Sequence, residues 1–256
     1  MGFVGGSLGV RIMTWLSPDG QNPAMDARAY RDVSKLEKLF GPQIFALLQG
    51  KTVIDFGCGT GDQAIELAQR GARVIGVDIC ERYLEQARSK AAAAGVSDRC
   101  VFRTEPDEPA DFILSLDSFE HFDDPATILT IMASYLKPDG AVLVSFGPAW
   151  FHPYGGHLFS LFPWAHFIFT ERAMLEWRRG SRPDQTARTI AECGLNKMTI
   201  GRFERLVAHS PFRFASYEPR PIRRVRWLHN RLTREFFTST VRCTLARKDA
   251  SRLALA

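Results

Sequence analysis

The sequence predicts an α/β fold with a doubly wound, seven-stranded sheet, an antiparallel last strand, and helical and loop insertions. Three observations lead to this class. Short apolar runs alternate with stretches of helical periodicity between residues 50 and 147. The first run ends in a turn with glycines at 57, 59 and 61. Acidic residues follow several of the runs, which places them where the strands of such sheets bind ligands.

The first unit combines a strand, a glycine turn and a helix. Val53 and Ile54 suit a buried parallel strand, and the turn glycines let the backbone bend and approach a ligand. Asp62 is a candidate cap for the helix that follows. The glycine spacing differs from the dinucleotide pattern, and the carboxylate of Asp55, two residues before Gly57, would repel a pyrophosphate. We therefore expect a ligand that carries an ammonium group.

The second unit is a strand that ends in an acid. Residues 72–78 read as an apolar strand closed by Asp78, seventeen positions after Gly61. An acid near this position can accept hydrogen bonds from ribose hydroxyls. A plain strand–turn–helix corner with surface acids is the alternative, but the two units in register favour a nucleoside-binding site.

The remaining periodicities predict the other elements. A helical stretch over 26–48 breaks at Gly41-Pro42, and the glycine-rich residues 1–24 are expected to pack loosely. Residues 137–140 are expected to turn into the fifth strand. Helices are predicted over 81–94, 125–136 and 185–192, and strands over 100–103, 110–116, 141–146, 196–201 and 238–246.

The motifs at residues 53–61, 74–78, 116–121 and 136–140 resemble those of class I S-adenosylmethionine-dependent methyltransferases. The pattern is most similar to the small-molecule branch called type 11 and covers residues 50–147 best. The resemblance implies a Rossmann-like fold, with S-adenosylmethionine as cofactor and S-adenosylhomocysteine as product. The cofactor-binding residues that it implies are Asp55, Gly57, Cys58, Gly59, Gly61, Asp78, Ile79, Glu105, Asp117 and Ser118. One loop departs from the family, because Thr104-Glu105-Pro106 stands where a Gly-Asp pair usually meets the adenine.

Four segments are expected along the chain. Residues 1–49 form an N-terminal helical cover over the cofactor pocket, or a cap on the sheet edge, with Tyr30 facing the ligand. Residues 50–147 bind the cofactor, and residues 148–182 form a lid and acceptor insertion. Residues 183–256 complete the sheet and carry an arginine-rich insertion.

Histidines are the candidate catalytic residues, because histidine can take a proton near neutral pH. His152 and His157 bound a glycine-containing loop after the fifth strand, and His121 follows the fourth strand. His157 is the first candidate for a general base, followed by His152 and His121. Each also has a structural alternative, a hydrogen bond within its own loop. Metal ligation by His152 and His157 lacks an evident third ligand, so no metal is predicted.

Candidate acceptor-binding residues surround these histidines. They are Tyr30, Glu120, Tyr154, Phe159 and Trp164. The aromatic residues of 159–169 suit a planar or apolar acceptor pocket. They equally suit a core beneath the lid, or an amphipathic segment that faces a membrane.

Charge is distributed unevenly along the chain. Residues 1–150 contain 14 Lys and Arg against 20 Asp and Glu, whereas residues 151–256 contain 19 against 8. The densest basic run consists of Arg220, Arg223, Arg224, Arg226, Arg231 and Arg234. It is either a solvated face or a surface for an anionic acceptor or for membrane headgroups. No nucleic-acid recognition module accompanies the run, so nucleic-acid binding is not expected.

Cysteine content and the absence of recognised targeting motifs limit the classes of protein that fit the sequence. Five scattered cysteines without a CxxC pair argue against a disulfide framework and fit a reducing compartment. No signal peptide, myristoylation motif or membrane span is recognised, so a cytoplasmic location is expected. The whole predicts an enzyme that methylates a small-molecule acceptor, for example at a hydroxyl or phenol. The alternatives are a lipid or macromolecule methyltransferase that docks through its basic half, and a non-catalytic module that binds S-adenosylmethionine. The sequence leaves the oligomeric state open.

Overall fold

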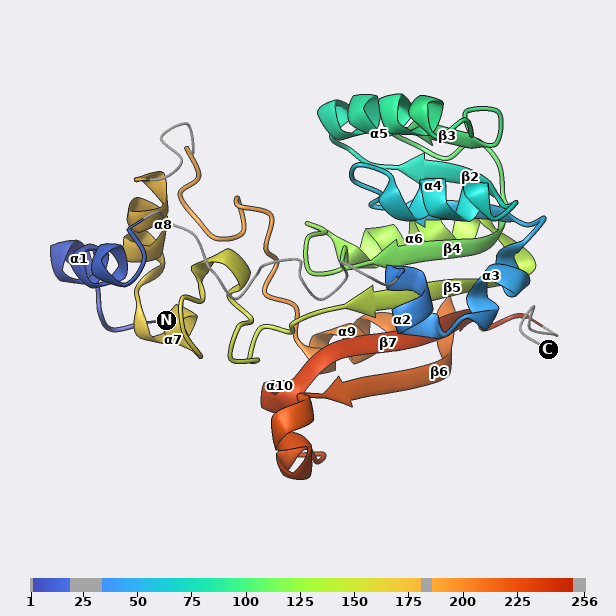
Figure 1. Ribbon diagram of the computed structural model, residues 1–256. Helices are drawn as coiled ribbons and strands as arrows, with labels where there is room; N and C mark the ends of the chain where they lie inside the picture. Colours follow the sequence, from blue (N-terminus) through green and yellow to red (C-terminus); the bar gives the residue numbers. More distant parts are fainter. Residues whose placement is uncertain (1, 19–33, 181–185, 251–256) are drawn as a thin grey trace.

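Two lobes make up the protein, and the larger one is built on a seven-stranded sheet (Figure 1). The computed structural model describes residues 2–18, 34–180 and 186–250. The strands are ordered β3-β2-β1-β4-β5-β7-β6 across the sheet. Strands β1 to β5 pair in parallel, and β7 runs antiparallel between β5 and β6. The predicted doubly wound sheet with an antiparallel last strand is thus confirmed.

The strands have the following bounds. They are β1 Thr52–Phe56, β2 Arg73–Val77, β3 Cys100–Arg103, β4 Ala110–Leu116, β5 Leu136–Phe146, β6 Phe212–Pro221 and β7 Thr238–Arg247. Because β5 and β6 both pair antiparallel with β7, β6 runs parallel to the first five strands. In Figure 1 the arrows of β4, β5 and β6 accordingly point toward the smaller lobe, so the carboxyl edge of the sheet faces that lobe.

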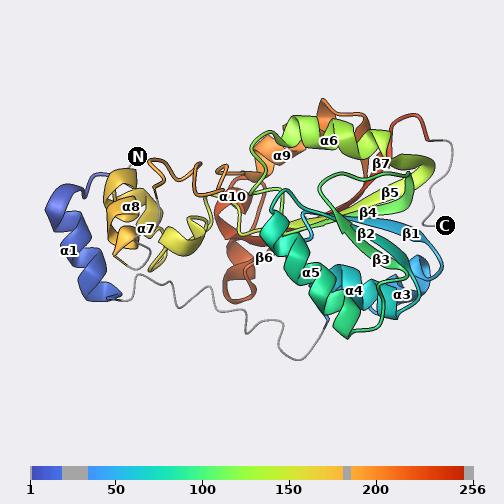
Figure 2. The ribbon, with the colours of Figure 1, turned by 90° about the horizontal axis from the view of Figure 1, so that it is seen from above.

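Helices cover both faces of the sheet. In Figure 2, α3, α4 and α5 lie on one face, and α6 and α9 lie on the other. The bounds are α2 Lys35–Phe40, α3 Gln43–Leu48, α4 Asp62–Gln69, α5 Glu81–Ala93, α6 Pro125–Ser134 and α9 Ile200–Ala208. The helices predicted after the second strand and before the fifth strand are therefore present, and the predicted break in the 26–48 stretch separates α2 from α3. The part of that stretch before residue 34 lies outside the described residues.

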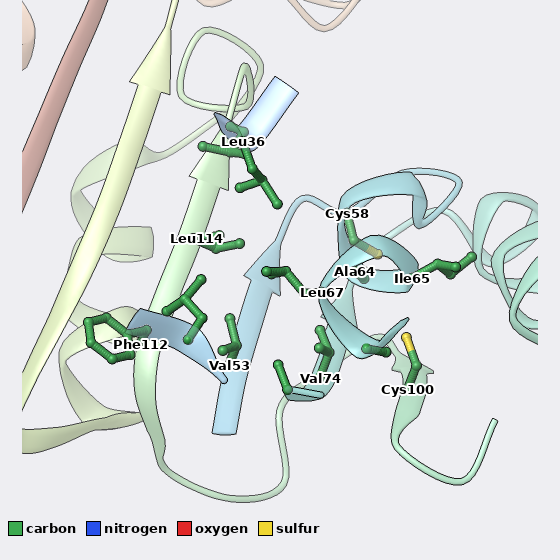
Figure 3. Close-up of a cluster of buried hydrophobic side chains, with 14 of the residues drawn as sticks. Leu36, Val53, Cys58, Ala64, Ile65, Leu67, Val74, Cys100, Phe112 and Leu114 are labelled. Atoms are coloured by element: carbon green, nitrogen blue, oxygen red, sulfur yellow. The ribbon is translucent and has the colours of Figure 1, made fainter. Parts of the chain in front are cut away.

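Each face of the sheet has its own apolar core. On the first face, Leu36 of α2 and Leu67 of α4 pack over Val53 of β1 and Leu114 of β4 (Figure 3). Ile54, the next residue along β1, joins the core on the opposite face. A parallel strand between two helical layers must be apolar on both faces, which explains why β1 lacks polar alternation.

The smaller lobe combines the N-terminus with the segment after β5. It contains α1 Gly6–Leu16, η3 His157–Phe159, α7 Ala165–Ile168 and α8 Glu171–Arg179. Met13 of α1 and Met174 of α8 are fully buried in its separate core. Gly9 lets the two helices approach closely, since a Cβ there would lie 3.2 Å from the Cβ of Ala173. The expectation of loose packing before residue 24 is wrong for α1, because its apolar side faces α8.

The predicted strand over 196–201 is wrong, because Ile200 begins α9. The hydroxyl of Thr199 accepts a hydrogen bond from Arg202 N at 3.1 Å, which caps the helix. The carboxylate of Glu235, from α10 Arg234–Phe237, accepts two more bonds from Ile200 N and Gly201 N, at 2.9 and 2.7 Å. The sixth strand is instead β6, which begins at Phe212.

Three smaller expectations also need correction. The helix expected over 185–192 is wrong, because residues 188–194 form bends and turns, in which Thr189 Oγ1 accepts from Glu192 N at 3.1 Å. The expected turn at 137–140 is part of β5, which tolerates it through a register irregularity opposite β4. The cap of α4 is Gly61 in the left-handed region rather than Asp62, which lies in the first turn and pairs with Lys90.

Candidate active site

The glycine turn is held by β2 and by two crowded glycines. Gly57 N and Cys58 N donate to Val77 O at 2.8 and 3.0 Å, while the Cys58 side chain points into the core. Gly57 has φ +82°, and a Cβ on it would lie 2.6 Å from Ser118 Oγ. A Cβ on Gly61 would lie 2.7 Å from the ring of Phe102. Larger residues at either position would displace their neighbours.

Gly59 differs from the other two turn glycines. Its φ is +51°, but no atom lies within 4 Å of the Cβ position. The turn is therefore packed at its ends and open at Gly59, where a ligand can approach the backbone.

Asp78 brings the second motif to the glycine turn, as the spacing predicts. Its Oδ2 accepts from Gly59 N at 2.9 Å, and its Oδ1 accepts from Cys80 N at 2.9 Å. Each carboxylate oxygen keeps a lone pair for a hydroxyl donor. Ile79 follows with a 94% exposed side chain, and Glu105 is exposed on the loop after β3. Asp78, Ile79 and Glu105 all follow the carboxyl ends of their strands.

Three carboxylates and one lysine form the polar centre of the site. Asp55 and Glu120 are each only 2% exposed. Asp117, with φ +54°, forms an ion pair with Lys35 of α2 at 2.8 Å and accepts from Ser145 Oγ at 3.3 Å. Glu120 Oε1 accepts from Gly147 N at 3.1 Å.

Two carboxylate oxygens of this centre are buried without a hydrogen-bond partner among the described residues. They are Asp55 Oδ2 and Glu120 Oε2. Burial raises the pKa of Asp55 to about 7, against the opposing charge of Lys35. Burial and the neighbouring Asp117 raise the pKa of Glu120 to about 8. A cation that enters the site would lower the pKa of both groups, because it favours their charged forms.

These features fit the cofactor that the resemblance implies. An ammonium group would satisfy the unpartnered oxygen of Asp55, and ribose hydroxyls would bind the fixed carboxylate of Asp78. The open backbone at Gly59 leaves room for the ligand between them. Lys35 was not among the predicted site residues, because nothing in its local sequence marks it. Only the fold brings α2 over the end of β4.

The structure brings His121 and His157 together. Their ring centroids lie 5.7 Å apart, with the planes at 76°. His121 is exposed, and its Nδ1 lies 2.5 Å from Gly194 O, whereas His157 is buried, with its Nε2 3.2 Å from Pro148 O. Carbonyl oxygens only accept, so the hydrogen bond to Gly194 O places a proton on His121 Nδ1. Burial lowers the pKa of His157 to about 4, and His121 adds to the effect.

His152 makes its hydrogen bond within its own loop. Its Nδ1 accepts from Tyr154 N at 3.0 Å, and burial lowers its pKa to about 4. This bond is the local structural role considered in the sequence analysis. Within the described part of the chain, no group of three His, Cys, Asp or Glu side chains is placed to hold a metal ion.

The predicted acceptor-binding aromatics lie in the smaller lobe. Phe159 is buried in the core of that lobe, with the guanidinium of Arg178 5.6 Å above its ring. Trp164 donates from Nε1 to Phe151 O at 3.0 Å, and Tyr154 is half-buried. Tyr30 lies outside the described residues. Contact of these side chains with an acceptor stays a prediction.

A surface hollow of about 450 Å³ lies elsewhere, between α6 and α9. Its lining includes Thr127, Arg202 and His209 but none of the predicted site residues. Both helices cover one face of the sheet, away from the glycine turn.

A family model, curated proteins and solved structures match this chain. A family model described as a methyltransferase domain matches residues 25–188. The chain is 33% identical over 160 residues to the ubiquinone biosynthesis O-methyltransferase of Neisseria meningitidis serogroup C, and these cover 58% of this chain and 65% of that protein. It is 39% identical over 104 residues to the protein of the same name from Idiomarina loihiensis, which covers 38% and 43%. The matched part of the chain thus spans less than two thirds of the length of these curated relatives.

Solved structures show the same fold at low identity. An S-adenosylmethionine-dependent methyltransferase from Mesorhizobium loti matches with a TM-score of 0.51 and 20% identity, covering 81% of this chain and 97% of that one. Magnesium protoporphyrin IX methyltransferase from Synechocystis PCC 6803 matches with a TM-score of 0.50 and 18% identity, covering 94% and 100%. No described helix has the length and apolar character needed to cross a membrane. The chain belongs to the methyltransferase domain family, as its resemblance to class I S-adenosylmethionine-dependent methyltransferases predicts.

Proposed function

We propose that this protein transfers a methyl group from S-adenosylmethionine to a hydroxyl of a small aromatic acceptor. The observation that carries the proposal is the meeting of the open glycine turn, the buried acids and the histidine pair at one edge of the sheet. The curated relatives are named as O-methyltransferases of ubiquinone biosynthesis, which supports oxygen as the methylated atom and an apolar aromatic acceptor. Contact with a membrane surface, predicted as a further partner, is compatible with such an acceptor and is kept in the proposal.

Three residues hold the cofactor in this proposal. Asp55 binds the ammonium group of the methionine moiety, Asp78 binds the ribose hydroxyls, and Gly59 leaves space for the ligand beside the backbone. S-adenosylmethionine supplies a methyl group that is already activated by its sulfonium. The protein must therefore align the acceptor and remove its proton.

His121 is the stronger candidate for the general base, although the sequence favoured His157. A base with a pKa of about 4, as for His157, accepts a phenolic proton poorly. His121 is exposed, and its Nδ1–H donates to Gly194 O, which leaves Nε2 as the nitrogen that can accept a proton. His157 then serves as a packing partner that orients the ring of His121.

Single substitutions distinguish the two histidines. We expect His121→Ala to lower kcat by about 10²–10⁴-fold with a phenolic acceptor, and to leave the affinity for S-adenosylhomocysteine unchanged. His157→Ala should lower kcat less, because it removes only the orientation. His209→Ala is the matched control, since its exposed ring also bonds a carbonyl, that of Arg205 at 2.8 Å. Full activity of His121→Ala with a loss in His157→Ala would reverse the assignment.

A further inference from the structure

The connection between β6 and β7 exposes large apolar side chains. We call residues 222–237 the arginine insert; it consists of η4 Arg223–Leu228, a turn and α10. Trp227 is 76% exposed, Leu232 is 89% exposed and Phe236 is 41% exposed. Exposed apolar side chains that cluster in one segment commonly mark an interaction surface.

The arginine insert also carries unpaired positive charge. Arg223, Arg224, Arg226 and Arg231 are exposed and form no ion pair with any described residue. Residues 219–234 contain no acid. Arg234 is different, because Glu204 binds its guanidinium through both carboxylate oxygens, at 2.5 and 2.6 Å. Four of the arginines are therefore available to an external anion.

Hydrogen bonds hold the insert in one shape although its apolar side chains are exposed. Ile222 N donates to Phe237 O at 2.8 Å and closes its base. Asn230 Oδ1 accepts from Leu232 N at 2.9 Å and from Thr233 N at 3.2 Å, which forms the turn that presents Leu232. The display of Leu232 thus comes from the backbone conformation of the turn.

The insert projects from the edge of the sheet that carries the active site. Because β6 runs parallel to β5, the chain enters the insert at the carboxyl edge. Figure 1 shows α10 beside the end of β6, and Figure 2 shows it between the sheet and the smaller lobe. Phe236 packs against Phe151, at 5.6 Å between ring centroids, and so joins the insert to the segment that contains His152 and His157.

We propose that the arginine insert docks this protein on an anionic lipid bilayer. Trp227 and Leu232 would enter the boundary between headgroups and acyl chains, while the four arginines bind anionic headgroups. A nucleic acid would use the arginines but would leave Leu232 in water, so it fits the surface less well. The inference extends the proposed function to the surface where an apolar acceptor would be met, but its test does not depend on methyl transfer.

Vesicle binding of the whole protein tests the proposal. Sedimentation with phosphatidylglycerol–phosphatidylcholine vesicles at low salt should show binding, and vesicles of phosphatidylcholine alone should bind much less. R223E/R224E should lower the partition coefficient by about tenfold or more. The control R205E/R213E removes the same charge from two exposed arginines outside the insert and should bind as the unmodified protein does. W227A/L232A should lower binding by about tenfold even at low salt.

Several results would overturn the proposal. Equal binding by R223E/R224E and the unmodified protein would do so, as would an equal loss in the control. Concentration-dependent dimers that W227A/L232A abolishes, without vesicle binding, would assign the surface to a second copy of the chain. Salt-sensitive binding of a single-stranded oligonucleotide in place of vesicles would assign it to nucleic acid. If R223E/R224E fails to fold, R223A/R224A and a salt titration of the unmodified protein give the same decision, because headgroup binding must weaken with salt.

Discussion

Between about pH 4 and pH 8, Asp55 and Glu120 are protonated more often in the folded protein than in the unfolded chain. Their pKa values in the folded protein are about 7 and about 8, against 3.8 and 4.5 for the free groups, and burial is the main cause. The folded state therefore binds more protons than the unfolded state between about pH 4 and pH 8. Their contribution to the free energy of unfolding is fully present below pH 4 and is lost as the pH rises to about 8.

Asp55→Asn should flatten this part of the stability profile. The substitution removes one titrating group, so the free energy of unfolding should fall less steeply, by about 1 kcal/mol per pH unit, between pH 5 and pH 7. Urea unfolding at pH 5, 6 and 7 measures the slope. Asp139→Asn, at an exposed acid, should keep the slope of the unmodified protein. An unchanged slope in Asp55→Asn would show that Asp55 is ionised in the folded state.

Lys35 influences the pH at which Asp55 and Glu120 ionise. Its ammonium group lowers the pKa of both Asp55 and Glu120. In the proposed function, Asp55 binds the cofactor's ammonium group in its charged form. Lys35→Met should shift the pH midpoint of S-adenosylhomocysteine affinity upward by about one unit. Calorimetry from pH 6 to pH 9 measures the midpoint, with Lys38→Met on the same helix as control. A midpoint that stays or falls would contradict this role.

At the scale of elements, Trp177 fastens α1 to α8. Its ring is buried, and its Nε1 donates to Ser17 O at 3.1 Å. Trp177→Ala should destabilise the smaller lobe by about 3–5 kcal/mol, whereas Trp177→Phe, which loses mainly the hydrogen bond, should cost about 1 kcal/mol. Amide hydrogen exchange over residues 6–16 should rise in the first variant. Exchange that rises equally in the β1–β5 core would show that the lobes unfold as one unit.

An element could be predicted when the residues that determine it lie close together in the sequence. The units around Asp55 and Asp78 could be predicted because a strand, a turn and an acid lie within a few residues of each other. The segment 196–201 was wrongly predicted as a strand. The helix that begins at Ile200 is capped partly by Glu235, which lies thirty-five residues away in the sequence. Helix α1 was missed because its glycines suggest a loop, while its stability comes from packing against α8.

At the scale of the whole molecule, the two proposed sites differ in charge. The acidic half contains the centre at Asp55, Asp117 and Glu120, and the basic half contains the arginine insert. The cofactor motifs could be recognised in the sequence because class I sites contain them in a fixed order along the chain. The roles of the candidate acceptor-side residues could not be ranked from the sequence, because His121, His157 and Gly194 are brought together only by the fold.

The proposed function requires S-adenosylmethionine to bind across the glycine turn and Asp78. Calorimetric titration of S-adenosylhomocysteine into the unmodified protein and into Asp78→Ala tests it most directly. We expect binding by the unmodified protein, and a loss of about 1–3 kcal/mol in Asp78→Ala through lost charge-assisted hydrogen bonds. Asp98→Ala, at an exposed acid just before β3, should bind normally. Equal affinity in Asp78→Ala and the unmodified protein, or no binding to either, would contradict the claim.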